Sequence, residues 1–539
     1  MESLAADLST MVRTPLADSH VRAISRIADE VTFQPGEMIA EVGDPMDRFI
    51  YILEGEIAVI DPWTRERYLP FALGPTQFVG EIAFLTGGSY SLPMRAEQET
   101  RVLSAPREAM LDLMGQIPEM SDIIITVFAA RRRRQIEEQD SSLKIIGADV
   151  DRNIRSIASF AARNRIPYRS IDLGSAEADD IAHACQIGPK TPAVIFGKDQ
   201  LVEDPTPAKV AHLLGIAVDL DKSDVFDVVI VGGGPGGVAA GVYAGAEGMS
   251  ALVLDDVAIG GQAGTSSRIE NYMGFPTGIS GADLCWRGEV QALKFGTRFA
   301  VPRRATSLEK LEDGLFCVGL DDGDQVCARA VIVATGVQYR RLPLDRLEAL
   351  EGAGIYYAAT DLEARYCRND EVAVIGGGNS AGQAAMFLSR TSKHVHVLVR
   401  GPSLAASMSD YLLSRLESDP SITIHYSTEI SELHGDDTLS GCTIRAKAAG
   451  EEWRLNTRAV FVMVGAAPNT GWLSGLVDLD AKGFVRTGPE VGAPSVFATS
   501  TPGIFAVGDV RAGSVKRVAS AVGEGSVVIS RVWEHLNPS

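Results

Sequence analysis

The chain reads Asp227-Val-Val-Ile-Val231 and continues directly into Gly232-Gly-Gly234-Pro-Gly-Gly237. A continuous run of β-branched residues is typical of a buried parallel strand, and the Ala-rich stretch that follows is typical of a helix. At such a turn, Gly232 permits the tight bend, Gly234 lets the backbone approach a pyrophosphate, and Gly237 allows close helix–strand packing. The segment therefore predicts a dinucleotide-binding unit that opens a doubly wound α/β domain.

A second unit of the same kind follows further along the chain. Val372–Ile375 leads into Gly376-Gly-Gly378-Asn-Ser-Ala381, and the next strand, Val395–Val399, ends in Arg400. In the first unit the corresponding strand ends in Asp255, an acid that can accept the hydroxyls of a ribose. Arg400 favours a 2′-phosphate, hence NADPH over NADH, although an ordinary surface arginine is the alternative. Two dinucleotide sites predict hydride transfer from a nicotinamide to a second redox ring.

Composition and charge exclude several classes of protein. At about 150 residues per domain, 539 residues imply three or four domains. The 50 Lys and Arg against 70 Asp and Glu give a net charge of −20, which argues against nucleic acid or an anionic membrane as the main partner. No run of about 18 apolar residues is present, so we expect no membrane insertion. Met1–Thr10 lacks the apolar centre of a signal peptide, and we expect a cytoplasmic protein.

Histidines and cysteines give neither a metal-binding pattern nor a disulfide framework. His394 and His396 share one face of a strand, but no further Cys, His or carboxylate cluster joins them, so we expect a strand surface and no metal. The six cysteines are scattered without a Cys-x-x-Cys pair, which favours reduced thiols. These cysteines are Cys185, Cys285, Cys317, Cys327, Cys367 and Cys442.

The N-terminal 215 residues differ in pattern from the rest. From Val31 to Ala105, short β-rich runs alternate with turn residues, which predicts a small barrel or roll. Helical periodicity follows from Arg107 to Glu138, and we interpret its basic run Arg131–Arg134 as a solvated helix end rather than a nucleic-acid patch. Leu143–Gly215 predicts a β-α-β unit followed by β-β-α, with a cis bond at Thr191-Pro192.

Several further motifs follow between residues 260 and 518: Gly260-Gly-Gln262, Ile269–Pro276, Ala334-Thr-Gly336, Gly465–Thr470 and Gly508-Asp509 with Lys516-Arg-Val518. Through these motifs the chain from Phe226 to the C-terminus resembles the thioredoxin reductase family, in which an NADPH domain is inserted into an FAD domain. The resemblance implies FAD and NADPH as cofactors, with NADH possible, and a homodimer. The candidate cofactor-binding residues are Gly232, Gly234, Gly237, Asp255, Gly261, Gln262, Asn271, Thr335, Gly336, Gly376, Gly378, Asn379, Ser380, Arg400, Gly508, Asp509, Lys516, Arg517 and Val518.

Two departures from that family bear on the chemistry. Where the family carries its Cys-Ala-Thr-Cys dithiol, this chain reads Ala358-Ala-Thr-Asp361. Disulfide exchange needs one thiolate to attack and a second thiol to resolve, so reduction of thioredoxin by that route is excluded. Cys367 is the nearest thiol and a candidate catalytic residue, with inert packing as the alternative. Of the family's His-Arg-Arg motif and a further Arg for NADPH, Arg400 alone remains.

The N-terminal segments resemble two further families. Residues 31–134 resemble a cyclic-nucleotide-binding β-roll through Phe33–Glu37, Gly43–Asp47, Tyr51–Gly55 and Phe78–Glu81. The resemblance makes Gly80 and Glu81 candidate ligand residues, but the family's phosphate-binding arginine falls on Ser91. Arg95 replaces it only if the loop changes register, so we expect cyclic-nucleotide binding to be lost.

Residues 143–215 more weakly resemble a thioredoxin- or glutaredoxin-like domain, with Gly147–Val150 where that family has cysteines. We expect it to be redox-inactive, a spacer or docking module. The expected organisation is thus a multidomain α/β protein whose domains span residues 1–140 (β-roll and helices), 141–217 (thioredoxin-like), 225–340 with 469–539 (FAD), and 341–468 (NAD(P)H).

These observations predict an FAD-dependent NAD(P)H oxidoreductase that passes hydride from NADPH to FAD and then to an acceptor, without an internal disulfide. The acceptor is a small molecule or a protein: a quinone, a ferredoxin- or flavodoxin-like carrier, oxygen, or an outside disulfide. One alternative is a regulatory flavoprotein redox sensor whose N-terminal domain binds a ligand or partner. Another is a disulfide reductase that uses Cys367.

Overall fold

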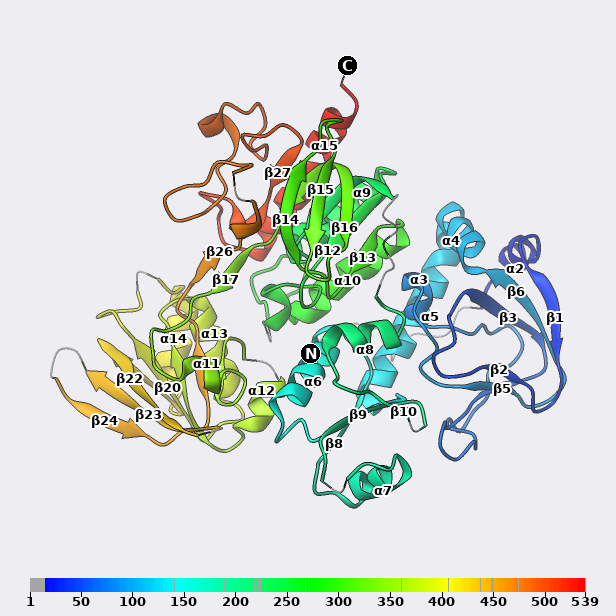
Figure 1. The fold of residues 1–539 in the computed structure, drawn as a ribbon, viewed down its shortest axis with the longest axis horizontal. Helices are drawn as coiled ribbons and strands as arrows, with labels where there is room; N and C mark the ends of the chain where they lie inside the picture. The colour runs from blue at the N-terminus through cyan, green and yellow to red at the C-terminus, as the bar shows by residue number, and fades with distance from the viewer. Residues whose placement is uncertain are drawn as a thin grey trace.

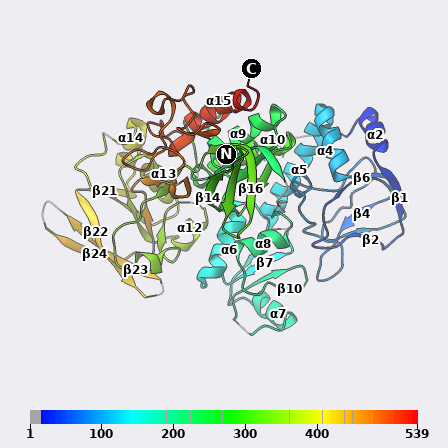
Figure 2. The ribbon, with the colours of Figure 1, turned by 45° about the horizontal axis from the view of Figure 1, so that its top comes forward.

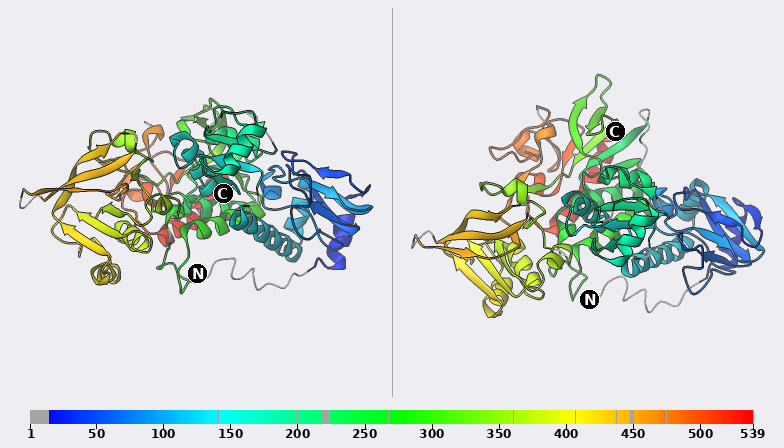
Figure 3. Two further views of the ribbon diagram at one scale, coloured as in Figure 1. Left: turned by 90° about the horizontal axis from the view of Figure 1, so that it is seen from below. Right: turned by 60° about the horizontal axis from the view of Figure 1, so that its bottom comes forward.

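A computed structural model of the chain describes residues 15–538, apart from residues 140, 189, 199, 218–219, 221–223, 267, 360, 406, 437, 447–449 and 474. Met1–Thr10, expected to lack a signal peptide, lies outside the described residues. Within the described part, no helix is long and apolar enough to cross a bilayer. The molecule is elongated, with the N-terminal module at one end and the inserted parallel-sheet module at the other (Figures 1 and 3).

The N-terminal module combines two small antiparallel sheets with helices. The sheets run β1-β6-β3 and β2-β5-β4. The predicted helical stretch 107–138 is divided in two, because Pro118 cannot donate a backbone hydrogen bond within a continuous helix. Its elements are α2 (Asp18–Ser25), β1 (Asp29–Phe33), β2 (Met38–Ala40), β3 (Arg48–Glu54), β4 (Ile57–Val59), α3 (Ala83–Thr86), β5 (Met94–Ala96), β6 (Thr100–Pro106), α4 (Arg107–Gln116) and α5 (Pro118–Glu138).

The middle module follows the predicted β-α-β and β-β-α order. Its four-stranded sheet has the order β10-β9-β7-β8, with β7 parallel to β8 and antiparallel to β9. The expected cis bond at Thr191-Pro192 is wrong: among the described residues the cis peptide bond is Val301–Pro302. Its elements are β7 (Leu143–Ile146), α6 (Arg152–Arg163), β8 (Arg169–Ile171), α7 (Ala176–Ala184), β9 (Ala193–Phe196), β10 (Gln200–Leu201) and α8 (Pro207–Leu213).

The first glycine-rich unit belongs to a seven-stranded sheet of order β13-β12-β11-β16-β15-β14, with β27 beside β16. Helices α9 and α15 lie side by side against it (Figure 2). Its elements are β11 (Val225–Val231), α9 (Pro235–Ala246), β12 (Ala251–Leu254), η1 (Ala263–Thr265), α10 (Gly281–Lys294), β13 (Arg298–Ala300), β14 (Ala305–Lys310), β15 (Phe316–Leu320), β16 (Gln325–Val333), η2 (Gly471–Leu473), η3 (Gly488–Val491), β27 (Ile504–Ala506), η4 (Gly508–Val510) and α15 (Val518–Leu536).

The second unit belongs to an inserted module with a five-stranded parallel sheet, β18-β25-β19-β20-β21, and a three-stranded sheet, β22-β23-β24. A two-stranded antiparallel ribbon, β17 with β26, carries the chain out to this module and back. Its elements are β17 (Val337–Tyr339), α11 (Leu347–Leu350), β18 (Ile355–Tyr356), α12 (Asp361–Tyr366), β19 (Glu371–Ile375), α13 (Asn379–Leu388), β20 (His394–Val399), α14 (Asp410–Ser418), β21 (Ile422–Tyr426), β22 (Thr428–Gly435), β23 (Leu439–Ala446), β24 (Glu452–Leu455), β25 (Val460–Val462) and β26 (Ala466–Pro468).

The four strands predicted around the glycine-rich turns are confirmed as β11, β12, β19 and β20. The expectation that all thiols are reduced is wrong for one pair. Cys317 and Cys327 form a disulfide across the hairpin of β15 and β16, where they face each other with Cα atoms 4.1 Å apart. The hairpin register places them together, although no Cys-x-x-Cys spacing marks them.

Candidate active site

The first glycine-rich turn has the geometry of an anion-binding cradle. Gly232 adopts a φ of +112°, and a Cβ there would collide with the carbonyl oxygen of Ala334. A Cβ on Gly237 would collide with the carbonyl oxygen of Gly232, so the helix approaches the strand closely. Gly234 has open space around it and precedes α9, whose first N–H groups receive no side-chain cap. Uncapped N–H groups at a helix start can bind a phosphate.

Asp255 holds this turn in shape. Its Oδ2 accepts the Gly233 N–H at 2.8 Å, and its Oδ1 accepts the N–H groups of Val257 and Ala258 at 3.0 and 2.9 Å. Burial raises the pKa of Asp255 above its ordinary value, and these backbone donors oppose that shift. The carboxylate predicted to bind ribose thus also fixes the first glycine-rich turn.

Three further predicted residues lie beside the turn. Gly261 adopts a φ of +53°, and a Cβ there would lie 3.0 Å from Cα of Gly234. The Gln262 amide donates to the carbonyl oxygen of Val337 in the ribbon, and Thr335 Oγ1 donates to the Asn469 carbonyl at 2.9 Å. The segment 260–265 is therefore tied to the point where the chain leaves for the inserted module. Gly336 has a φ of +58° and open space around it, while Asn271 lies on an exposed loop.

The late Gly508-Asp509 motif reaches the same place from the C-terminal side. The Gly508 N–H donates to Glu524 Oε2 at 2.6 Å, which fixes η4 against α15. Burial raises the pKa of Asp509, and the charge of Lys516 opposes that shift. Arg517 is exposed and precedes α15, whose first residue is Val518 and whose N-terminus has no side-chain cap. The start of α15 thus faces the same region as the start of α9.

Apart from Asn271, the predicted cofactor-binding residues divide into two groups. The first group gathers around the carboxyl ends of β11, β12, β16 and β27, and it comprises Gly232, Gly234, Gly237, Asp255, Gly261, Gln262, Thr335, Gly336, Gly508 and Asp509, with Lys516, Arg517 and Val518 at the start of α15.

The second group lies at the carboxyl ends of β19 and β20 in the inserted module. Gly376 adopts a φ of +148°, and a Cβ there would collide with the Met463 carbonyl oxygen. Gly378 precedes α13, which has no side-chain cap and begins with Asn379 and Ser380, both exposed. Asn379 Oδ1 accepts the Ser409 N–H at 2.8 Å. Arg400 is exposed directly after β20.

Cys367 lies in the core of the inserted module. It is fully buried, and its Sγ donates to the Glu363 carbonyl oxygen at 3.3 Å. Burial raises the pKa of this thiol to about 11, which keeps it protonated at neutral pH. Of the segment that replaces the family's dithiol, Thr360 lies outside the described residues, and Ala359 is buried.

In the N-terminal module, both candidate ligand residues are engaged by α5. Arg132 donates from Nε and Nη2 to the two carboxylate oxygens of Glu81, each at 2.7 Å; Glu81 is buried, and the Arg132 side chain is 12% exposed. Arg131 donates to the carbonyl oxygen of Gly80 at 2.7 Å. The expectation of a fully solvated basic run is therefore wrong for its first half, because these two arginines turn inward. The second half, residues 133–134, makes exposed i,i+4 ion pairs with residues 137–138.

Ser91, the position expected to replace the phosphate-binding arginine, also makes hydrogen bonds to other parts of the chain. The carbonyl oxygen of Ser91 accepts the Ser142 hydroxyl, and its Oγ accepts the Gln135 amide at 3.3 Å. Arg95 lies on β5 and pairs with Glu97 at 2.9 Å, so it does not reach into the loop. Contacts with α5 and the middle module therefore fill the surroundings of Glu81 and Ser91.

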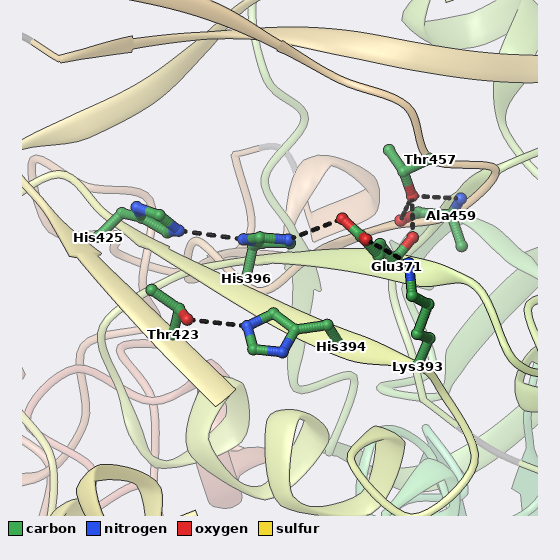
Figure 4. Close-up of polar contacts among 8 residues, drawn as sticks. All are labelled: Glu371, Lys393, His394, His396, Thr423, His425, Thr457 and Ala459. Atoms are coloured by element: carbon green, nitrogen blue, oxygen red, sulfur yellow. Dashed lines mark hydrogen bonds and ion pairs between the residues drawn. The ribbon is translucent and has the colours of Figure 1, made fainter. Parts of the chain in front are cut away.

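Histidines on β20 and β21 form a row of polar contacts that ends at Glu371 on β19 (Figure 4). His396 lies between His425 and Glu371. The Nδ1 atom of His396 is 3.1 Å from the Nε2 atom of His425, and its Nε2 atom is 3.3 Å from the Oε2 atom of Glu371. His394 Nε2 lies 2.8 Å from Thr423 Oγ1. Burial lowers the pKa values of His396 and His425. Among the described residues no group of three ligand-type side chains is arranged to hold a metal ion.

A cavity of about 310 Å³ lies where the middle module, the seven-stranded sheet's helices and the inserted module meet. Its polar wall includes Glu289, whose pKa burial raises to about 7 against the opposing charges of Arg165 and Arg132. Sequence reasoning missed Glu289. The signal was its place three residues after Trp286 and four after Cys285, which puts a carboxyl on the buried face of α10.

Two family models match this chain. The family model described as pyridine nucleotide-disulphide oxidoreductase matches residues 226–525, and the cyclic nucleotide-binding domain model matches residues 30–116. The thioredoxin reductase of Streptomyces clavuligerus is 35% identical over 304 residues, which cover 56% of this chain and 91% of that protein. The NADPH-dependent thioredoxin reductase 3 of Arabidopsis thaliana is 34% identical over 359 residues, 63% of this chain and 66% of that protein.

Among solved structures, the thioredoxin reductase of Lactococcus lactis in its FR conformation aligns with a TM-score of 0.53 and 28% identity, over 58% of this chain and 99% of that one. The resemblance expected from the motifs is thereby confirmed. The family model spans more than half of the chain and includes both glycine-rich turns. The chain therefore belongs to the pyridine nucleotide-disulphide oxidoreductase family, as a thioredoxin reductase-like, NAD(P)H-dependent flavoprotein oxidoreductase with an N-terminal cyclic nucleotide-binding domain.

Proposed function

We propose that this chain oxidises NADPH with the help of a bound FAD and delivers the electrons to an acceptor from outside the chain, without an internal dithiol. The observation that carries the proposal is the pair of glycine cradles, each open at an uncapped helix start and each in a different parallel sheet. Two such cradles suit one dinucleotide each.

The first group of residues fits FAD. A Cβ on Gly232 or Gly237 would fill or distort the cradle, whereas the space at Gly234 is open to a pyrophosphate. In the proposed site, Asp255 holds the turn and meets the ribose, and Asp509 meets the ribityl chain. Bound FAD supplies the capacity to accept a hydride and release its electrons. The start of α15, with Lys516 and Arg517 nearby, places positive charge beside the cofactor.

The second group fits NADPH. The uncapped start of α13 offers N–H donors to a pyrophosphate, and exposed Arg400 is available for a 2′-phosphate. The family's other arginines are absent, so the proposal keeps NADH as a weaker donor.

The acceptor comes from outside because the thiols among the described residues do not suit disulfide exchange beside the first cradle. Cys285 donates to the Gly260 carbonyl there at 3.7 Å, but it is buried and its pKa is raised to about 12. Ala358 and Ala359 cannot exchange disulfides, and Cys367 is buried and protonated. A disulfide reductase that uses Cys367 is disfavoured on these grounds. The proposed domains are residues 225–340 with 469–539 for FAD and 341–468 for NADPH.

The middle module, residues 141–217, is proposed as a redox-inactive, thioredoxin-like spacer. Its strand order and directions suit that fold, and Gly147 packs against Pro192 where a cysteine pair would otherwise lie. The sensor alternative requires a ligand or a partner at residues 1–140. Its ligand-binding form is disfavoured because Arg131 and Arg132 already hydrogen-bond to Gly80 and Glu81.

Anaerobic stopped-flow mixing of the FAD-loaded protein with NADPH, and separately with NADH, tests the proposal. We expect the flavin absorbance to bleach rapidly with NADPH and more slowly with NADH. Flavin that stays oxidised for minutes with both donors contradicts it. A flavin that bleaches once and is not reoxidised by any quinone, carrier protein, disulfide or oxygen supports the sensor instead.

A further inference from the structure

We propose that the cavity between the three modules binds a quinone, which serves as the electron acceptor of the proposed reaction. The inference rests on the proposed function, because it names the acceptor class of the same site. The cavity is bounded by the end of α6, by the segment 259–265 with α10, and by the segment before α12.

The size of the cavity sets the kind of ligand. Its volume of about 310 Å³ lies at the lower end of ordinary small-molecule sites. Walls from three modules surround it, and the modules are joined across it. Asn164 donates to the Val257 carbonyl at 3.0 Å, Arg165 pairs with Asp283, and Arg155 donates to the carbonyl of Gly352. A molecule of one or two rings fits this space, whereas a folded carrier protein or an extended peptide does not.

The apolar wall suits a flat ring. Trp286 is 7% exposed and lines the cavity together with Ile259 and the small side chains of Ala162 and Ala282. The guanidinium of Arg165 lies 5.0 Å from the centre of the Trp286 ring, which holds the indole in a fixed orientation. A rigid aromatic surface beside alanines leaves room for a planar ligand body.

The polar wall suits carbonyl oxygens. Arg163 and Arg165 offer N–H donors, and Ser159 offers a hydroxyl. Glu289 adds a carboxyl whose pKa of about 7 leaves a large share of it protonated at neutral pH. A protonated carboxyl donates a hydrogen bond and can give up its proton as a general acid. These hydrogen-bond donors at the edge of an apolar cavity can bind the two carbonyl oxygens of a quinone ring.

The position of the cavity suits electron delivery. Gly261 and Gly264 form part of its wall, and Gly261 lies against Gly234 of the first cradle. Ala358 lines the opposite side. Its methyl group stands where the thioredoxin reductase family carries the first cysteine of its dithiol. Space beside the flavin-holding segment is therefore left for an outside oxidant.

The reaction balances without a further reagent. NADPH and one proton convert the quinone into a hydroquinone and NADP⁺. NADPH supplies two electrons and one proton as a hydride equivalent. The Glu289 carboxyl gives the second proton to a quinone oxygen, and solvent protonates the carboxylate again. Both C=O groups of the ring become C–OH groups.

The test uses menadione, a two-ring quinone, and the full FAD-loaded chain. Binding to the oxidised protein is measured by calorimetry in the absence of NADPH, so this readout does not depend on turnover. The variant Ala162→Phe fills the cavity from the exposed side of α6, and Ser156→Phe adds the same bulk to an exposed position of that helix outside the cavity.

We expect Ala162→Phe to weaken menadione binding and to lower kcat/KM for menadione, each by about tenfold or more, and Ser156→Phe to change neither. Both variants should bleach the flavin with NADPH at the wild-type rate. Menadione that does not bind, or binding unaffected by Ala162→Phe, overturns the inference. Failure of NADPH to bleach the wild-type flavin overturns the proposed function instead, and the calorimetry then still decides whether the cavity binds a quinone.

Glu289→Gln separates proton donation from shape. The amide fills the same space but cannot give up a proton, so we expect menadione to bind as in the wild type while kcat falls and loses its decrease above about pH 7. An unchanged pH profile removes Glu289 from the reaction.

Discussion

The guanidinium of Arg132 binds both carboxylate oxygens of Glu81 through two hydrogen bonds of 2.7 Å. The two side chains come from α5 and from the segment before α3, and they are 12% and 9% exposed. Removing one partner of so buried a pair leaves an uncompensated charge, which typically costs about 3–5 kcal/mol.

We therefore expect Arg132→Met to lower the unfolding temperature of the N-terminal module markedly in differential scanning calorimetry. Adding Glu81→Gln to that variant should restore most of the loss, because the stranded carboxylate is then neutral. The exposed pair of Arg134 with Glu138 provides the control: Arg134→Met should change the unfolding temperature little. Equal losses in the two arginine variants would show that the buried pair is unimportant.

The same contact predicts that cyclic AMP and cyclic GMP bind poorly. Ribose hydroxyls have to compete with Arg132 for Glu81, and Ser91 offers no charge to the cyclic phosphate. Loss of such a phosphate contact costs about two to four decades in affinity. Calorimetric titration of the full chain should therefore detect no binding at micromolar nucleotide. Micromolar affinity would mean that α5 moves away from Glu81.

Arg400 provides a test of cofactor preference. We expect Arg400→Gln to raise KM for NADPH by about tenfold, since an exposed charge-assisted phosphate contact contributes about 1–2 kcal/mol. KM for NADH should stay the same. Lys393→Gln, which removes a positive charge at the opposite end of β20, is the matched control and should affect neither cofactor. Parallel changes for NADPH and NADH would assign Arg400 to something other than the 2′-phosphate.

Glu289 predicts a pH dependence of stability. Its pKa of about 7 in the folded chain lies above its ordinary value of 4.5, so between those pH values the folded chain keeps a proton that the unfolded chain has lost. Its contribution to stability is complete below pH 4.5 and declines as the pH rises to 7. Two neighbours of Glu289 do not titrate in that window, because the pKa of Cys285 is about 12 and that of Asp283 is below its ordinary value.

Unfolding temperatures of the wild type and Glu289→Gln at pH 5 and pH 8 measure this effect. We expect the variant to gain stability relative to the wild type at pH 8. An equal difference at both pH values would mean that Glu289 is ionised throughout.

Thiol counting tests the cysteines. Denatured, unreduced protein should react with a thiol reagent at four positions, and at six after reduction, because Cys317 and Cys327 form a disulfide. In the native chain we expect fast reaction at Cys185 alone, since Cys367 and the other two free thiols are buried. Six reactive thiols without reductant would rule out the disulfide.

The buried position of Cys367 gives a separate prediction. We expect NADPH to bleach the flavin of the Cys367→Ser variant, and the variant to turn over, at the wild-type rates.

Local signals in the sequence were sufficient for the glycine-rich turns. Strand, turn and helix adjoin one another at Gly232 and at Gly376, so a few neighbouring residues determine the shape of each turn. Resemblance then placed Gly508 and Gln262 in the same site, although they are distant in sequence.

Other features depend on contacts between segments that are distant in sequence, and no local pattern predicts such contacts. The pairing of Arg132 with Glu81 joins a helix to a loop 51 residues earlier. The cavity needs walls from three modules, so the spacing of Glu289 from Trp286 and Cys285 indicates a carboxyl on the buried face of α10 but not the groups that it faces. Cys317 and Cys327 were within reach of sequence reasoning, because the turn Asp321-Asp-Gly-Asp324 places them opposite each other in a hairpin.

One strand of the seven-stranded sheet, β27, is synthesised long after the other six. Val331 of β16 pairs with Ile504 of β27, and α15 follows β27 at the very end of the chain described. The whole inserted module is synthesised between these two partners and can fold while the sheet still lacks its last strand. A chain halted before Ile504 would therefore have the glycine cradle of the inserted module built, while the seven-stranded sheet that carries the first cradle still lacked β27.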